Sequence, residues 1–379
     1  CSGLRTVTIP PLVTSIGNST FAGCSGLCSV CVPDSIVSIG GSAFRGCNRL
    51  AKISIPDSVV FIGNSVFEDC SRLVEIALTN SLTAISYALF RNCSRLTSIA
   101  IPASTESIND HAFEGCGCLR AIAVPNNLKV IGEYAFSDCI GLESIIIPDS
   151  VMTIGTHAFS NCSGLVSLAI PDSISSIEES VFEGCCGLTS VALPESLKSI
   201  RDSAFAGCCG LDTVIIPVTV SMIGSAAFKD CDRLSSVTIP PPISVIKEST
   251  FSGCARLELM KIPHTITSIE SCAFLGCNGL TEMVIPDSVT FIGDSAFCGC
   301  CRLQSVRVSN RALEICNRTF MGCCDLVHIK IPSSVVSIGE SAFEGCDVLK
   351  TVEINGSVTS IGRKAFCGCS GLEAITIPS

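Results

Sequence analysis

Cysteine is the residue through which this chain could most readily do chemistry, because a thiolate can form a disulfide, bind a metal ion or act as a nucleophile. Of the 28 cysteines, seventeen recur every 23 residues, from Cys1 through Cys24 to Cys369. Equivalent side chains in stacked repeats point in parallel directions, which disfavours disulfides along this column even though the spacing of the repeats would permit them. We expect these thiols to be buried as small apolar side chains with a weak S–H donor.

The remaining eleven cysteines lie outside this column, and four of them form two matched pairs. Cys186 and Cys209 share one repeat position in adjacent copies, and Cys301 and Cys324 share it in another two adjacent copies. If the chain contains disulfides, these are the two that the sequence favours.

The spacing of the potential ligands and catalytic residues does not favour a metal site or a catalytic site. Cys28 with Cys31, and Cys298 with Cys301, have the spacing of zinc ligands, but about twelve repeats separate the two pairs, so they cannot complete one four-ligand site. No acid, base and nucleophile recur together, and the histidines fit solvated corners of the fold. We therefore expect no catalytic residue, no metal and no cofactor. The four histidines are His111, His157, His264 and His328.

The elements that must position these side chains follow from the strict 23-residue period. Phe recurs sixteen times from Phe21 to Phe366, and a Leu follows six residues after each copy, as far as Leu372. Such a period is typical of a solenoid, in which each repeat forms one coil and buries its apolar faces against its neighbours. We predict a single array over residues 1–379, with the Phe rings of successive coils in offset stacks. Both ends lack a capping repeat, so we expect a fragment of a longer chain or a molecule that stacks end to end.

One copy indicates how a coil should fold. Ile53 and Ile55 alternate with polar residues as in a strand, and Pro56, which has no N–H to donate, ends that strand. A second short strand is expected around Ile62. The segment around Phe67 is too short for a helix and predicts one helical turn. The predicted fold class is therefore α/β, with strands pairing in parallel from coil to coil.

Composition argues against several classes of partner. The net charge of −10 disfavours nucleic acid, whose binding proteins carry basic patches, and also disfavours anionic membrane surfaces. No apolar run approaches the ~20 residues that a membrane helix needs. Only 15% of the residues are charged, so the surface must consist largely of small polar side chains. We expect neither nucleic-acid binding nor direct insertion into a membrane.

The solvent-facing positions of the predicted longer strand, one, two and four residues after each Leu, form the surface with the most distinct chemistry. In the middle of the chain these positions are small and neutral, as at Ser167 and Ala169. Towards the C-terminus they gain charge. With no Trp and two Tyr, the chain offers no aromatic platform for sugars. A merely soluble strand face is the alternative to a ligand-binding one, for which the candidates are Lys261, Arg307, His328, Lys330 and Glu353.

The repeat consensus resembles a known family. The pattern Leu-x-x-Ile-x-Ile-Pro-x-Ser-Val-x-x-Ile-Gly-x-x-Ala-Phe-x-Gly-Cys is similar to the BspA-like (Treponema pallidum-type) leucine-rich repeat, and the copy from Leu280 to Phe297 matches it almost throughout. The resemblance covers the whole chain and implies a right-handed solenoid of about sixteen coils, with parallel strands on its concave side. It also implies a surface or secreted protein that acts in adhesion or binds host or matrix proteins, without catalytic residues.

Two functions are consistent with these observations. The first is a non-enzymatic interaction or adhesion module, located outside the cell or on its surface, that binds a protein ligand such as a host or matrix protein on the solenoid face. The second is a structural scaffold or self-assembling rod that associates end to end. A cytoplasmic location is the alternative to the extracellular one.

Overall fold

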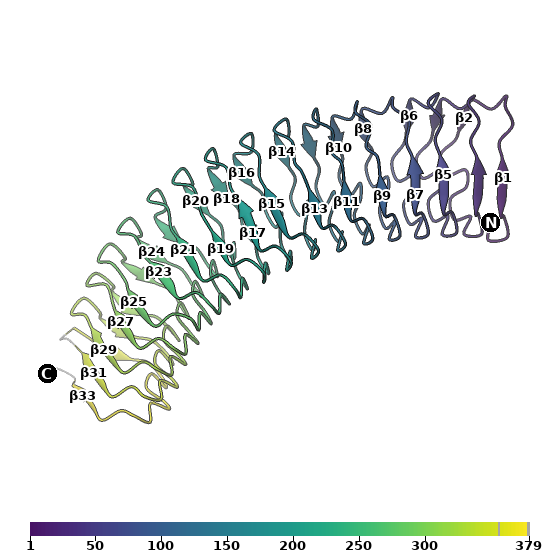
Figure 1. Ribbon diagram of the computed structural model, residues 1–379. Coiled ribbons are helices and arrows are strands. Elements are labelled where there is room, and N and C mark those ends of the chain that lie inside the picture. The colour runs from purple at the N-terminus through teal and green to yellow at the C-terminus, as the bar shows by residue number, and fades with distance from the viewer. Residues whose placement is uncertain (355–356, 377–379) are drawn as a thin grey trace. The chain divides into compact units, whose positions relative to one another are not determined.

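A computed structural model describes residues 1–354 and 357–376, which form thirty-three strands and no helix. The chain divides into two compact units, Cys1–Pro194 and Glu195–Ser379. Within each unit, successive coils lie side by side, as Figure 1 shows. None of the described residues forms a helix that could cross a membrane.

The strands are of two kinds that alternate along the chain. Those with odd numbers have two to four residues and are called long strands below, and those with even numbers have two residues and are called short strands. In one coil these are β5 (Lys52–Ser54) and β6 (Phe61–Ile62). Ile53 is buried between two exposed neighbours, so the alternation that predicted a strand is confirmed. The strand ends before Pro56, whose carbonyl accepts the N–H of Val59 in the turn that follows.

The strands of the two units have the following bounds. In the first unit the long strands are β1 (Thr6–Thr8), β3 (Ser29–Cys31), β5, β7 (Glu75–Ala77), β9 (Ser98–Ile99), β11 (Ala121–Ile122), β13 (Ser144–Ile145), β15 (Ser167–Ala169) and β17 (Ser190–Ala192). Its short strands are β2 (Ser15–Ile16), β4 (Ser38–Ile39), β6, β8 (Ala84–Ile85), β10 (Ser107–Ile108), β12 (Val130–Ile131), β14 (Thr153–Ile154) and β16 (Ser176–Ile177). In the second unit the long strands are β19 (Thr213–Val214), β21 (Ser236–Thr238), β23 (Leu259–Lys261), β25 (Glu282–Val284), β27 (Ser305–Arg307), β29 (His328–Ile331), β31 (Thr351–Ile354) and β33 (Ala374–Thr376). Its short strands are β18 (Ser199–Ile200), β20 (Met222–Ile223), β22 (Val245–Ile246), β24 (Ser268–Ile269), β26 (Phe291–Ile292), β28 (Glu314–Ile315), β30 (Ser337–Ile338) and β32 (Ser360–Ile361).

Equivalent residues of successive coils lie in register, as predicted. Ile53 of β5 pairs in parallel with Ile76 of β7, and neighbouring Phe rings stack on one another inside each unit. In the first unit the ring centroids of neighbouring Phe residues are 5.3–5.7 Å apart. In the second unit the separation is 5.2–5.8 Å. The apolar columns of the sequence therefore form the core.

The predicted helical turn around each Phe is wrong. The N–H groups of Ser42, Phe44 and Gly46 donate to carbonyls of the next coil at 2.8–3.0 Å, while the N–H of Arg45 between them donates back to Ser42 at 3.1 Å. The backbone alternates in this way because Ser42 and Gly46 have φ values of +56° and +70°. A helix needs consecutive right-handed residues bonded four apart. The segment from two residues before each Phe to two residues after it, called the turn segment below, instead forms a third ladder of hydrogen bonds between coils.

The second left-handed position of the turn segment, two residues after each Phe, explains a pattern in the sequence. Its sixteen copies are eleven Gly, three Asp and two Asn. These are the residues that adopt positive φ at least cost, Gly because it has no Cβ and Asn and Asp because their short side chains tolerate the left-handed region. The copies that are not Gly are Asp69, Asn92, Asp138, Asn161 and Asp230.

Candidate functional site

Four of the five nominated residues lie in one row on the solvent side of the long strands of the second unit. Val284 of β25 pairs with Arg307 of β27, which pairs with Lys330 of β29, and Lys330 pairs with Glu353 of β31. Lys261, at the end of β23, has the same repeat position one coil before Val284. The set of Lys261, Val284, Arg307, Lys330 and Glu353 is called the charged row below. The paired strands β25, β27, β29 and β31 set the spacing of four of them, and Lys261 lies on β23, the last strand of the preceding sheet.

His328 belongs to a parallel row two residues earlier in each strand. It pairs with Ser305 on one side and Thr351 on the other, and its Nδ1 lies 2.7 Å from the Thr351 hydroxyl. The long strands therefore place all five nominated side chains on one face, but His328 stands beside the charged row and not in it.

Two cations of the charged row already have carboxylate partners. Arg307 Nη2 donates to both oxygens of Asp287 at 3.1 and 3.2 Å, and Lys330 Nζ lies 3.9 Å from Glu353 Oε2. The backbone N–H of Asn310 makes the largest contribution to holding the pKa of Asp287 below its usual value, with further help from the Asn310 side chain and Arg307. All of these groups are exposed, so solvent screening leaves each pair with little net contribution to stability.

Lys261 differs from the other cations of the row. Within residues 1–354 and 357–376, no carboxylate forms an ion pair with its ammonium group. It borders a hollow of about 700 Å³ on the strand face, whose apolar surface includes Val284, Pro263 and Pro286. The Val284 side chain is 56% exposed. The ionisable residues that line this hollow are Lys261, His264, Glu282 and Arg307.

A second hollow provides an uncharged counterpart in the first unit. It has a volume of about 510 Å³ and lies over β13, β15 and β17, where no lining residue carries a charge. Ile146 at its edge is 84% exposed. The other solvent-facing positions of these strands are Ser144, Ser167, Ala169, Ser190 and Ala192.

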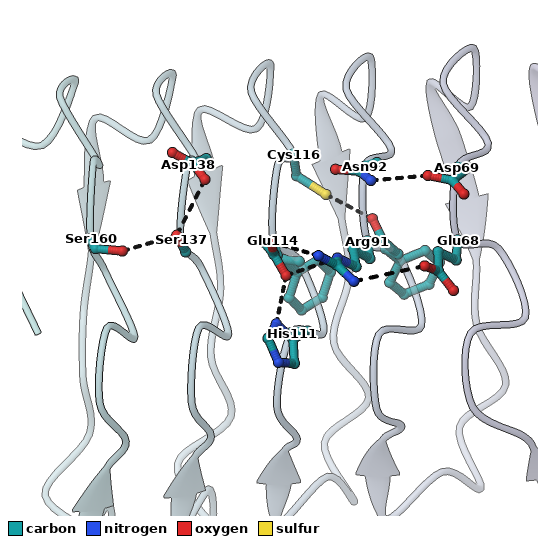
Figure 2. A network of polar contacts seen from close by, with 12 residues as sticks. Glu68, Asp69, Arg91, Asn92, His111, Glu114, Cys116, Ser137, Asp138 and Ser160 are labelled. Carbon is teal, nitrogen blue, oxygen red and sulfur yellow. Dashed lines mark hydrogen bonds and ion pairs between the residues drawn. The ribbon is translucent and has the colours of Figure 1, made fainter.

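A polar cluster in the turn segments of the first unit was not predicted. The side chains one residue after Phe alternate in charge over four coils, from Arg45 to Glu114, and Figure 2 shows the contacts among Glu68, Arg91 and Glu114. Arg45 Nε lies 3.3 Å from Glu68, Arg91 contacts Glu68 at 3.9 Å, and Arg91 Nε lies 2.9 Å from Glu114. His111 Nδ1 lies 2.5 Å from Glu114 Oε2. The alternation of sign every 23 residues was the signal that could have revealed it.

Two histidines belong to an aromatic stack beside that series, so they are not the solvated corner residues that we expected. His111 lies 5.0 Å from Tyr134, and Tyr134 lies 4.6 Å from His157, with nearly parallel rings. Tyr87 packs edge-on against His111 at 5.3 Å. Tyr134 shares the repeat position of both histidines, which is the sequence signal that we missed. The ring faces are occupied by one another, so the stack offers mainly ring edges to a ligand.

The cysteine column is buried from Cys24 to Cys346, as predicted, whereas Cys1 is exposed and Cys369 is half-buried. Cys70 Sγ donates to the carbonyl of Phe44 at 3.2 Å, and the same bond recurs in the following coils. Of the nominated disulfide pairs, Cys301 and Cys324 occupy equivalent positions in neighbouring coils, and the pKa of Cys324 is raised by burial and then by the Cys301 thiol. The second pair consists of Cys186 in the first unit and Cys209 in the second, and it stays a prediction.

Metal ligands do not gather in the part of the chain that the structure describes. There, no group of three or more His, Cys, Asp or Glu residues is placed to hold a metal ion. The charged row instead brings together three cations, one carboxylate and an exposed aliphatic side chain. Chemically, this arrangement suits binding through charge and apolar contact.

The family model described as "BspA type Leucine rich repeat region (6 copies)" matches residues 1–120, 106–233, 200–327 and 313–379. The chain therefore belongs to the BspA-type leucine-rich repeat family, as its consensus predicted. The described fold is accordingly a leucine-rich-repeat solenoid of about sixteen coils with parallel strands. Leucine-rich repeat proteins are typically non-enzymatic and generally mediate protein–protein interactions.

Solved structures support this assignment. The chain is 30% identical to a leucine-rich repeat protein from Bacteroides ovatus, with a TM-score of 0.72 over 98% of this chain and 86% of that one. It is 27% identical to a leucine rich cell surface protein from Faecalibacterium prausnitzii, with a TM-score of 0.50 over 98% of this chain and 87% of that one. No curated protein matches the chain.

Proposed function

We propose that this protein is a non-enzymatic interaction module that binds a protein partner on the long-strand face of its second unit. The charged row carries this proposal. Its residues Lys261, Arg307 and Lys330 place cations around an exposed valine, whereas the corresponding positions of β15 and β17 are alanine. The pairing of β25, β27 and β29 holds Val284, Arg307 and Lys330 in place before a partner arrives, so less conformational entropy is lost on binding.

We also propose that the partner is an extracellular protein, such as a host or matrix protein, and that this chain acts in adhesion at the cell surface. Membership of the BspA-type family and the name of the Faecalibacterium prausnitzii cell surface protein support this proposal. The shallow strand face also suits a protein better than a small molecule, because small-ligand sites usually enclose most of the ligand's surface.

Site-specific photocrosslinking tests the proposed docking face. The crosslinking amino acid p-benzoylphenylalanine would be placed at position 284 in one variant and at position 146, over the uncharged hollow, in the matched control. Each variant would be irradiated with a panel of purified matrix glycoproteins. We expect adducts from position 284 and few from position 146. Equal yields from the two positions would count against the proposed face.

The structural scaffold is the alternative function, and the same preparation distinguishes it. A binding module should sediment as one species over a wide range of protein concentration. A self-assembling rod should instead grow with concentration, which sedimentation velocity measures directly. A chain that binds none of the matrix proteins and assembles into larger species would favour the scaffold.

A further inference from the structure

We propose that the hollow around Val284 binds an extended acidic segment of the partner, in which carboxylates lie two residues on either side of an aliphatic side chain. The inference rests on the proposed function and adds the chemistry of the partner. It starts from the order of groups in the charged row, where Lys261, Val284 and Arg307 stand on three successive coils.

The centre of this arrangement is apolar and open to solvent. Val284 is 56% exposed, and Pro263 and Pro286 extend the apolar surface on the side where the strands end. Removing such surface from water favours binding, so an aliphatic side chain is the group best suited to cover Val284.

The charges on either side of Val284 favour carboxylates. Lys261 has no ion-pair partner in the described part of the chain, so it can accept a carboxylate without breaking an existing contact. Arg307 directs one guanidinium nitrogen, Nη2, to Asp287, and a guanidinium carries five N–H donors in all. Glu282 is the one carboxylate that lines the hollow, so the cations outnumber it.

The spacing of the three groups selects an extended partner segment. Coils whose strands pair, as β25 and β27 do, are about 4.8 Å apart, and β23 lies one coil before β25 at the end of the preceding sheet, so the outer cations of the trio arise about 10 Å from each other. In an extended segment, side chains two residues apart point to the same side about 6.6 Å apart. Carboxylates at positions i and i+4 with an aliphatic residue at i+2 therefore present the matching order, and the flexible Lys and Arg side chains span the remaining distance.

Peptide binding to the full chain tests this proposal. The probe is a fluorescein-labelled, end-capped nonapeptide of Ser and Gly with Asp at two positions four apart and Leu midway between them. A second peptide has Lys in place of both Asp residues, and a third has Ser in place of Leu. Fluorescence anisotropy should show the acidic aliphatic peptide binding at least about tenfold more tightly than the lysine peptide, a difference of about 1.4 kcal/mol.

Variants of the protein locate the binding site. Lys261→Glu should weaken binding of the acidic peptide at least tenfold, whereas Lys198→Glu, which makes the same charge change outside the long-strand face, should change it less than twofold. Val284→Ser should weaken binding at least threefold, and Ile146→Ser at the uncharged hollow less than twofold. Raising NaCl from about 50 to 500 mM should also weaken binding, because salt screens exposed charges. Thermal unfolding of each variant confirms that it is folded.

Three results would overturn the inference: equal binding of the acidic and lysine peptides, equal effects of Lys261→Glu and Lys198→Glu, or displacement of the peptide by octanoate as effectively as by unlabelled peptide. The last result would identify a fatty-acid site instead. If position 284 still crosslinks to a matrix protein while the acidic peptide fails to bind, the proposed function stands and this inference fails. If the peptide binds through Lys261 but no matrix protein crosslinks, the inference stands and the proposal of an extracellular matrix partner fails.

Discussion

At the scale of single residues, each fully buried cysteine of the column keeps its proton because its surroundings oppose the thiolate. Burial raises the pKa of Cys93 well above the ordinary thiol value, and the thiol of Cys70 in the preceding coil adds to that effect. Cys93 Sγ also donates to the carbonyl of Phe67 at 3.2 Å, a bond that the thiolate cannot make. The fully buried cysteines of this column are therefore unreactive in the folded state.

Alkylation with N-ethylmaleimide measures this difference. At pH 8 we expect the exposed cysteines Cys31, Cys118 and Cys367 to react at least about a hundredfold faster than Cys70 and Cys93, because reaction needs an accessible thiolate. Peptide mass spectrometry at increasing times gives the rate for each position. In urea all five should react alike, and rapid labelling of Cys70 in the native protein would contradict the prediction.

The nominated Cys301–Cys324 pair is tested by oxidation. With oxidised glutathione, we expect Cys301 or Cys324 to form a mixed disulfide, after which the other thiol displaces glutathione and forms the Cys301–Cys324 bond. The exchange converts one oxidised glutathione into two reduced molecules and two protein thiols into one disulfide. Non-reducing peptide mass spectrometry should detect the linked peptides. A Cys301→Ser variant should retain glutathione on Cys324, and the recovery of both native residues as thiols would reject the pair.

At the scale of elements, the sequence predicted strands better than turns, for a physical reason. Strands such as β5 repeat an alternation of exposed and buried residues, and that alternation is visible in the sequence. The turn segment instead depends on backbone handedness at Ser42 and Gly46, which apolar periodicity does not reveal. The restriction of one column to Gly, Asn and Asp was the available signal.

At Gly276, the free-energy cost of placing a side-chain-bearing residue in the left-handed region can be measured without other effects. Its φ is +71°, and a Cβ added there would meet no atom within 4 Å. Gly276→Ala should therefore destabilise the protein by about 1–2 kcal/mol through backbone strain alone. Gly276→Asn should cost clearly less, because Asn tolerates this region and occupies the equivalent position at Asn92 and Asn161. Urea unfolding compares the two variants, and equal losses would refute this explanation.

The Phe stack should contribute much more to stability than any exposed aromatic ring. Phe136 is fully buried and stacks on both neighbouring Phe rings at 5.3 Å, whereas Phe61 is 58% exposed. Phe136→Ala should lower the free energy of unfolding by about 3–5 kcal/mol. The matched Phe61→Ala should lower it by less than about 1 kcal/mol. Similar unfolding midpoints for the two variants would show that the stack contributes little.

At the scale of the whole molecule, the repeat made the position of the candidate site predictable but not its contacts. Lys261, Arg307 and Lys330 could be placed in one row because the register follows from the 23-residue period. The ion pair of Arg307 with Asp287 depends on side-chain directions that no period specifies. Val284 satisfied the same positional rule, but we nominated only polar residues and so missed the apolar centre of the hollow.

The buried thiols together predict a loss of stability at alkaline pH. Burial raises the pKa of Cys185 and of Cys254 from 9.0 to about 12. As the pH rises above 9, the unfolded state therefore loses these protons before the folded state does, and the free energy of unfolding falls until the pH reaches about 12. Each such thiol should contribute about 1.4 kcal/mol of loss per pH unit.

Urea unfolding at pH 7 and pH 10 checks this expectation at constant ionic strength. The midpoint should be markedly lower at pH 10. A Cys254→Ala variant starts from a lower stability because it leaves a cavity, but it should lose less between the two pH values than the parent protein does. Equal midpoints at the two pH values, or an equal loss in the variant, would contradict the role given to the thiols.

The alternating charges of Arg45, Glu68, Arg91 and Glu114 have a consequence for how such a chain can change in length. Every coil presents the same Phe, Leu and Cys columns, so the apolar core alone would let any coil follow any other. Excising the single coil that carries Glu68 would set Arg45 beside Arg91, whereas excising two coils would place Arg45 beside Glu114 and keep opposite signs adjacent. Along this stretch, gains and losses of coils in even numbers should be tolerated best.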